Sequence, residues 1–163
     1  MTPGRSVVII TVSDRAAAGV RADASGPAAE LAVRAAGYDD VAVVVVPDDV
    51  DAIRAELREA IAGAAALVLT LGGTGIGPRD RTPEATAAVL DLELPGVAEV
   101  LRERGRRATP TAALGRGRAG VAGGALVVNL PGSPRAAVES LEVLLPLVPH
   151  ALDQLGGGDH RWP

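Results

Sequence analysis

The chain has 163 residues, 48% of them apolar, and its 20 acidic and 16 basic residues give a formal net charge of −4. It has no cysteine and no lysine, which excludes disulfides, thiolate zinc sites, cysteine nucleophiles, lysine Schiff bases and the lysine of a Walker loop. The acidic balance and the near absence of aromatic side chains argue against nucleic-acid binding.

The N-terminal residues contain only a short apolar stretch and lead directly into a predicted strand, unlike a signal peptide. No apolar run approaches the roughly 18 residues that a membrane span requires. We therefore expect a cytoplasmic protein without a membrane partner. Residues 1–155 are expected to form a single α/β domain, and residues 156–163 a loose C-terminal tail.

Continuous apolar runs rich in β-branched residues predict the strands of a parallel sheet. They lie at residues 7–12, 41–46, 67–71 and 126–130. Because these runs do not alternate with polar residues, we expect both faces of the sheet to be covered.

Helical patterns separate the predicted strands. In residues 49–64, apolar side chains recur at helical spacing opposite arginines and glutamates. Residues 28–36 show a second helical pattern, which Gly37 ends.

Two further helices are predicted from their first residues. Thr82 and Ser133 are each followed by proline, as in an N-cap followed by a proline in the first helical turn. The second of these helices spans residues 134–155, and we expect Pro146 and Pro149 to break or kink it.

Short apolar pieces on either side of Gly123 and Gly124 predict a β-hairpin. The expected fold class is therefore α/β. It has three layers, with a mostly parallel sheet, helices on both faces and one antiparallel hairpin strand.

Three loops follow predicted strands and should meet at one edge of the sheet. They are residues 13–26, 72–80 and 131–134. Ligands of open α/β sheets bind at this edge, where free N–H groups of helix N-termini favour anions and glycines allow close approach. Any one such loop is equally well explained as a tight turn, but three at one edge favour a binding site for a small anionic ligand.

Residues 115–120, GRGRAG, match a dinucleotide-binding fingerprint in spacing but precede a strand instead of following one. We therefore expect no dinucleotide site. We interpret the segment as a flexible loop whose arginines are available to phosphate.

Two aspartates at the same edge are candidates for the chemistry. Asp48 follows the second predicted strand, where it or Asp49 would also serve simply as a helix N-cap. Asp80 lacks that explanation, because Thr82 is already placed to cap the next helix. A carboxylate beside an anion-binding loop repels phosphate unless a cation joins them, and Mg²⁺ binds carboxylates together with phosphate oxygens.

The same loops resemble the molybdopterin-binding family of molybdenum cofactor biosynthesis. The resemblance covers about residues 7–155 and is carried by TVSDRAAAG, VPDD, LTLGGTGIGPRDRTPEAT, LPGVAEVLR and VVNLPGSPRA. It is strongest to the molybdopterin adenylyltransferases, a branch that includes the N-terminal domain of gephyrin.

The resemblance implies that Asp48 and Asp80 are the catalytic aspartates and hold Mg²⁺. It also implies binding residues on all three loops: Ser13, Asp14, Arg15, Gly72, Gly73, Thr74, Gly75, Pro131, Gly132 and Ser133. One departure is visible, since Gly115 stands where the family commonly has serine, although Arg116 is retained.

The implied reaction is adenylyl transfer from ATP to molybdopterin, giving adenylyl-molybdopterin and pyrophosphate. The resemblance further implies a homotrimer and contacts with other proteins of the pathway. An alternative is a pterin-binding or scaffold member without catalysis, against which the retention of both aspartates argues. A hydrolase like the competence-damage-inducible family is a third reading, but its GGLGPT-like loop differs from GGTGIGPRD.

Aromatic clamping of the pterin is not expected. Tyr38 is predicted at the opposite edge of the sheet, and Trp162 in the tail. We therefore expect backbone groups of residues 72–75 and 131–133 to hold the ligand, together with the Thr74 hydroxyl.

Overall fold

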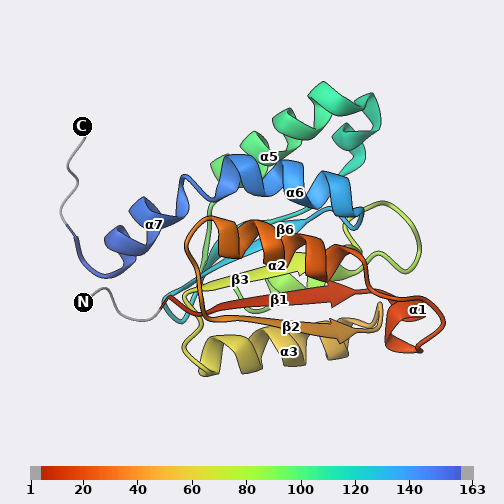
Figure 1. Cartoon of the computed structure of the whole chain (residues 1–163), viewed down its shortest axis with the longest axis horizontal. Coiled ribbons are helices and arrows are strands. Elements are labelled where there is room, and N and C mark those ends of the chain that lie inside the picture. The colour runs from red at the N-terminus through yellow and green to blue at the C-terminus, as the bar shows by residue number, and fades with distance from the viewer. Residues whose placement is uncertain (1–4, 159–163) are drawn as a thin grey trace.

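A six-stranded sheet with strand order β2-β1-β3-β6-β5-β4 forms the centre of the fold (Figure 1). The structure is a computed structural model and describes residues 5–158. The strands are β1 (Val7–Val12), β2 (Val41–Val46), β3 (Leu67–Leu71), β4 (Leu92–Glu93), β5 (Ala119–Ala122) and β6 (Ala125–Leu130). The helices are α1 (Asp14–Ala17), α2 (Ser25–Ala35), α3 (Val50–Ala62), α4 (Thr82–Ala87), α5 (Pro95–Ala108), α6 (Pro134–Leu144) and α7 (Val148–Leu155), with a 3₁₀ turn, η1 (Pro110–Leu114).

Strands β2, β1, β3 and β6 pair in parallel, so their carboxyl ends meet at one edge of the sheet. The predicted strands are confirmed, and only the fourth differs, because it begins one residue earlier at Ala125. The predicted hairpin at Gly123 and Gly124 joins β5 to β6. Its antiparallel part is larger than expected, since the two-residue strand β4 pairs with β5 at the edge.

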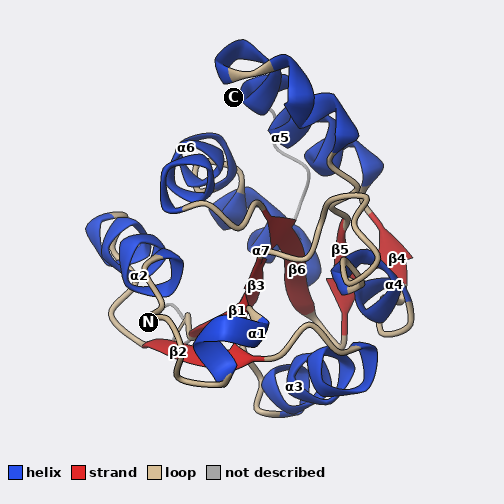
Figure 2. Cartoon of the chain, turned by 90° about the vertical axis from the view of Figure 1, so that its right-hand side faces the viewer, coloured by secondary structure: helices blue, strands red, loops and turns tan. Residues whose placement is uncertain are grey.

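Helices cover both faces of the sheet, which confirms the three-layer α/β fold (Figure 2). On one face, Ile9 of β1 packs in a core with Val33 of α2 and Leu141 of α6. On the other face, Ile10 of β1 packs with Ile53 of α3. Neighbouring residues of one strand thus enter different cores, which explains why the strands are apolar throughout.

The predicted helices are present with shifted ends. The one expected at residues 28–36 begins earlier, at Ser25. The C-terminal helical segment is broken as expected, into α6 and α7, with Pro146 in the break. Helices α1 and α5 were not predicted. Of the expected C-terminal tail, residues 159–163 lie outside the described part of the chain.

The predicted capping role of Thr82 is wrong. Arg81 occupies the N-cap position of α4 and makes no side-chain cap bond. Thr82 is the first helical residue, fully buried, and its hydroxyl donates to the carbonyl oxygen of Gly72 at 2.9 Å. The Thr-Pro pair correctly located the start of the helix, but the threonine hydroxyl holds the loop that precedes the helix.

Within residues 5–158, no helix is both long and apolar enough to cross a membrane.

Asn129 of β6 connects buried polar groups from several elements. Its Nδ2 donates to the hydroxyl oxygens of Thr70 and Thr86, each at 2.9 Å. Its Oδ1 accepts from the backbone N–H of Arg118 at 2.9 Å. The side chain therefore joins β3, α4 and the segment before β5 through satisfied hydrogen bonds.

Replacing Asn129 with alanine should destabilise the protein by about 3 kcal/mol, because buried partners on three elements lose their hydrogen bonds. Urea unfolding measures this change. Ser6→Ala is a suitable control, since it removes only a long, exposed hydroxyl contact of 3.5 Å. A loss below about 1 kcal/mol for Asn129→Ala would show that water replaces these bonds.

Candidate functional site

The three predicted loops meet at the carboxyl edge of the parallel strands. This edge is on the right in Figure 1 and faces the viewer in Figure 2. The backbone N–H of Gly72 donates to the carbonyl oxygen of Leu130, which joins the loop after β3 to the end of β6. Ser25, at the start of α2, donates its hydroxyl to the carbonyl oxygen of Gly132. The sequence therefore placed these loops together correctly.

The loop after β3 turns back sharply onto the start of α4. Gly73 has φ of +65°, and a Cβ there would collide with the side chain of Thr82. The N–H of Thr82 donates to the carbonyl oxygen of Gly73 at 3.1 Å. This glycine is required by the fold of the loop itself, besides its expected role in admitting a ligand.

Asp80 lies near the end of this loop and is hydrogen-bonded to Gly77. Its Oδ2 accepts from the backbone N–H of Gly77 at 2.8 Å, and its own N–H donates to the carbonyl oxygen of Gly77 at 3.0 Å. A Cβ at Gly75 would lie only 2.8 Å from the same Oδ2. Gly75 thus provides the room that the Asp80 carboxylate occupies, a role that the sequence alone did not indicate.

Arg116 holds the loop from the other side. Its Nε donates to the carbonyl oxygen of Gly75 at 2.7 Å and one terminal nitrogen donates to the carbonyl oxygen of Asp80 at 2.8 Å. It also pairs with Glu84 and thereby lowers the pKa of that carboxyl group. The sequence suggested Arg116 as a phosphate contact, but the structure uses its guanidinium to fix the shape of this loop.

Asp48 is not a helix cap. Asp49 is the N-cap of α3, with Oδ1 accepting from the N–H of Ala52 at 2.9 Å. Asp48 Oδ2 instead accepts from the N–H of Asp14 at 2.9 Å. Burial raises the pKa of Asp48, and the charges of Asp14 and Asp80 act in the same direction. The two predicted catalytic aspartates therefore lie close enough for their charges to interact.

The loop after β1 supplies a further carboxylate. Asp14 makes a bidentate ion pair with Arg79, at 2.7 Å and 2.9 Å, and this contact lowers the pKa of Asp14.

Two of the predicted binding residues are helix caps. Ser13 caps α1 and Ser133 caps α6, each through its side-chain oxygen. Arg15, also predicted for binding, is exposed on α1.

A cavity of about 380 Å³ opens beside the loop after β3. Of the predicted binding residues, Thr74, Gly75 and Pro131 lie on its wall. The rest of the wall is formed mainly by α5, η1 and α6, with apolar groups such as Leu101 and with Arg102. The contribution of α5 to the cavity wall was not predicted, although the spacing of apolar residues in residues 94–101 indicated a helix.

Tyr38 is buried near the amino ends of the strands, as expected.

In residues 5–158 there is no group of three or more histidine, cysteine, aspartate or glutamate side chains suited to a metal. Asp48 and Asp80 each use one carboxylate oxygen in the hydrogen bonds described above. The second oxygen of each carboxylate accepts no hydrogen bond from residues 5–158, and carboxylate oxygens are the ligand type that Mg²⁺ binds, together with substrate phosphates and water.

The chain is similar in sequence and in fold to proteins of molybdenum cofactor biosynthesis. A protein of Synechococcus elongatus, described as a molybdenum cofactor biosynthesis bifunctional protein, is 42% identical over 157 residues, which cover 96% of this chain and 49% of that protein. The chain therefore spans about half of that relative. A Helicobacter pylori protein named molybdopterin adenylyltransferase is 37% identical over 91% of this chain and 86% of its own length.

The solved structure of the molybdopterin biosynthesis Mog protein from Mycobacterium ulcerans superposes with a TM-score of 0.88. It is 44% identical and covers 93% of this chain and 99% of that one. The family model described as a probable molybdopterin binding domain matches residues 8–150, which include the three loops and both aspartates. The chain belongs to this family of molybdopterin-binding domains.

Proposed function

We propose that this protein transfers the adenylyl group of ATP to molybdopterin, releasing pyrophosphate, as a step of molybdenum cofactor biosynthesis. The observation that carries the proposal is the placement of Asp48 and Asp80. Both residues follow parallel strands at the carboxyl edge of the sheet, and Asp48 is free of the capping role that would otherwise explain it. Relatives named molybdopterin adenylyltransferase support the same reaction.

The chemistry requires no general base. The terminal phosphate of molybdopterin is already anionic near neutral pH and attacks the α-phosphorus of ATP, while the bond to pyrophosphate breaks. Catalysis then rests on positioning the two phosphates and on offsetting their charge. Mg²⁺, when bound by Asp48 and Asp80, would supply the positive charge. In this proposal the pterin binds in the cavity whose wall includes Thr74 and Pro131, and backbone groups of the loop after β3 orient it.

The reaction is tested by incubating the protein with ATP, Mg²⁺ and purified molybdopterin and measuring pyrophosphate. Pyrophosphate that forms only when both substrates and Mg²⁺ are present supports adenylyl transfer. Binding of molybdopterin without pyrophosphate identifies a pterin-binding or scaffold protein instead. Hydrolysis of ATP without molybdopterin identifies a nucleotide hydrolase.

Replacing Asp80 with asparagine should reduce kcat for pyrophosphate release at least about 100-fold while molybdopterin binding survives. The amide oxygen of asparagine still accepts from Gly77, so the loop keeps its shape, but the charge is lost. Asp91→Asn is the matched control, because Asp91 likewise accepts from a turn glycine, Gly123, at 2.8 Å. A parallel loss of molybdopterin binding in Asp80→Asn would place Asp80 in the pterin pocket.

Substitutions of Asp48 and of Asp49 should distinguish an effect on catalysis from an effect on stability. Asp48→Asn should weaken Mg²⁺-dependent use of ATP and leave the melting temperature nearly unchanged. Asp49→Ala should lose about 1 kcal/mol of stability, because the cap of α3 is removed, and should keep its activity. Steady-state kinetics and thermal unfolding of both variants test this pair. Full activity of Asp48→Asn would contradict the role proposed for Asp48.

We also propose that the protein is a homotrimer. Large apolar side chains on the described surface, among them Val20, Leu31 and Ile76, are 70–78% exposed and are candidates for burial between copies. Light scattering should report about three times the 16.4 kDa mass of the chain. A stable monomer at micromolar concentration would contradict this assembly.

A further inference from the structure

The carboxylate of Asp14 connects the loops that follow three different strands. Asp14 itself follows β1. Its Oδ1 accepts from the backbone N–H of Asp48, after β2, at 3.0 Å. Both of its oxygens accept from the guanidinium of Arg79, after β3, at 2.9 Å and 2.7 Å. One side chain therefore ties together the two loops that carry the proposed catalytic aspartates.

The contact between Asp14 and Asp48 is reciprocal. While the N–H of Asp48 donates to the Asp14 carboxylate, the N–H of Asp14 donates to Asp48 Oδ2 at 2.9 Å. This pair of bonds fixes both the backbone and the carboxylate of Asp48. It leaves the second carboxylate oxygen of Asp48 without a partner among residues 5–158.

Arg79 extends this connection to Asp80, its neighbour in the chain. The Arg79 guanidinium lies against Asp14, whereas the Asp80 carboxylate turns inward to the N–H of Gly77. Arg116 fixes the opposite side of the same loop through Gly75 and the backbone of Asp80. The position of Asp80 is thus set from two sides, by Arg116 and by the pair of Arg79 with Asp14.

We propose that Asp14 and Arg79 act as one positioning pair, which holds Asp48 and the Asp80 loop at a fixed separation for the adenylyl-transfer step. The proposal rests on the proposed function. In it, Asp14 binds neither substrate nor metal, and Arg79 contributes by holding Asp14. Asp14 thereby differs from the direct ligand-binding role that the family resemblance implied.

The exposure of the pair argues against a role in general stability. The side chains of Asp14 and Arg79 are 42% and 64% exposed, and ion pairs at such positions contribute little to the free energy of folding. A bidentate arginine–carboxylate contact does, however, restrict geometry strongly. Its expected effect is therefore on the alignment of the loops, where small displacements reduce catalysis strongly.

The test uses Asp14→Asn, Arg79→Gln and the double variant in the full chain. Each single variant should lower kcat for pyrophosphate release about tenfold with less than a twofold change in KM for ATP, because a ligand-binding role would raise KM instead. The double variant should lose no more than about tenfold, because residues that act as a unit are not additive. Melting temperatures should stay within about 2 °C of the unmodified protein.

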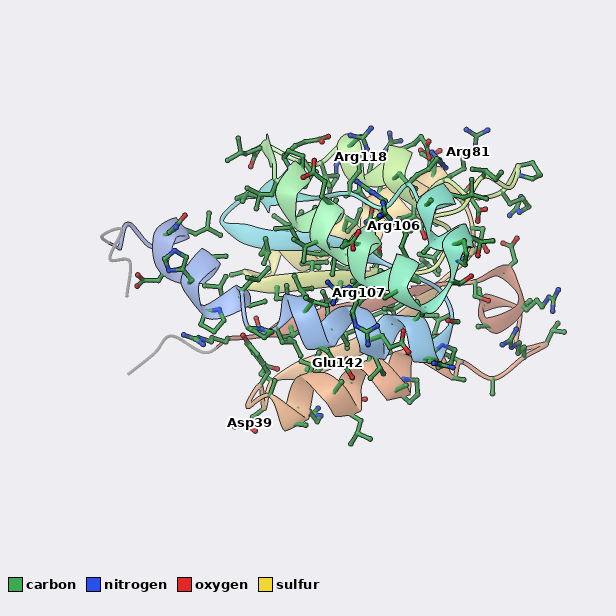
Figure 3. All side chains as sticks on the ribbon, turned by 90° about the horizontal axis from the view of Figure 1, so that it is seen from above. Asp39, Arg81, Arg106, Arg107, Arg118 and Glu142 are labelled. Atoms are coloured by element: carbon green, nitrogen blue, oxygen red, sulfur yellow. The ribbon has the colours of Figure 1, made fainter. Side chains whose placement is uncertain are left out.

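Arg106→Gln is the matched control. Arg106 lies on the outer face of α5 (Figure 3) and pairs with Glu103 at 3.0 Å, with side-chain exposures of 58% and 51%. Removal of this similarly exposed pair should change neither kcat nor the melting temperature. A similar loss of activity in this variant would show that any surface ion pair has the same effect, which would overturn the proposal.

A second readout is independent of activity. The N–H of Asp48 should exchange with solvent at least about tenfold faster in Asp14→Ala than in the unmodified protein, because its acceptor is removed. In Asp14→Asn, whose amide oxygen still accepts this hydrogen bond, the exchange rate should stay close to the original. Unchanged exchange in Asp14→Ala would overturn the proposed contact.

Two kinetic outcomes would also overturn the proposal. If the losses in kcat multiply in the double variant, Asp14 and Arg79 act separately. If Arg79→Gln raises KM for ATP about tenfold, Arg79 binds the nucleotide directly. Should the unmodified protein release no pyrophosphate, the proposed function fails, and the exchange of the Asp48 amide still tests whether Asp14 positions Asp48.

Discussion

The rest of the site depends on one constraint, the hydrogen-bonded turn that brings the chain after β3 back to the start of α4. The buried Thr82 hydroxyl donates to the carbonyl oxygen of Gly72. The Thr82 side chain also lies so close to Gly73 that a Cβ on Gly73 would collide with it. This turn closes residues 73–81 into a loop that begins and ends at the same point. Two features of the site belong to that loop. The cavity lies beside Thr74, and Asp80 lies near its end.

The strands and the site edge were predictable because they depend on simple patterns. A parallel sheet covered on both faces produces continuous apolar runs, and β1 to β3 end at the residues that these runs indicated. Loops that follow parallel strands must lie at the same edge, so the placement of Asp48 and of the loop after β3 at one edge followed from topology. The choice between Asp48 and Asp49 as helix cap did not follow, because both are capable residues and only geometry distinguishes them.

The features that could not be predicted depend on contacts between distant segments. Arg116 is separated from Gly75 by 41 residues, and nothing local shows that its guanidinium binds backbone carbonyl groups of that loop. The role of Gly75 is hidden in the same way, because its missing Cβ matters only where the Asp80 carboxylate folds back. The cavity wall from α5 and η1 likewise requires packing against α6. These residues shape the site without carrying a chemical signature of their own.

The charges at the carboxyl edge of the sheet bear on how an acidic protein without lysine would bring together the two anions of the proposed reaction. Asp14, Asp48 and Asp80 gather at the carboxyl edge of the sheet, yet Arg79 compensates only Asp14 directly, through its bidentate contact. Arg116 is engaged by Glu84 and by carbonyl oxygens of the loop, so its charge is largely offset as well. The remaining negative charge of Asp48 and Asp80 would repel phosphate groups unless a divalent cation lay between them. Under the proposed function, the excess of carboxylates therefore favours a substrate that arrives with its metal ion, as magnesium-bound ATP does.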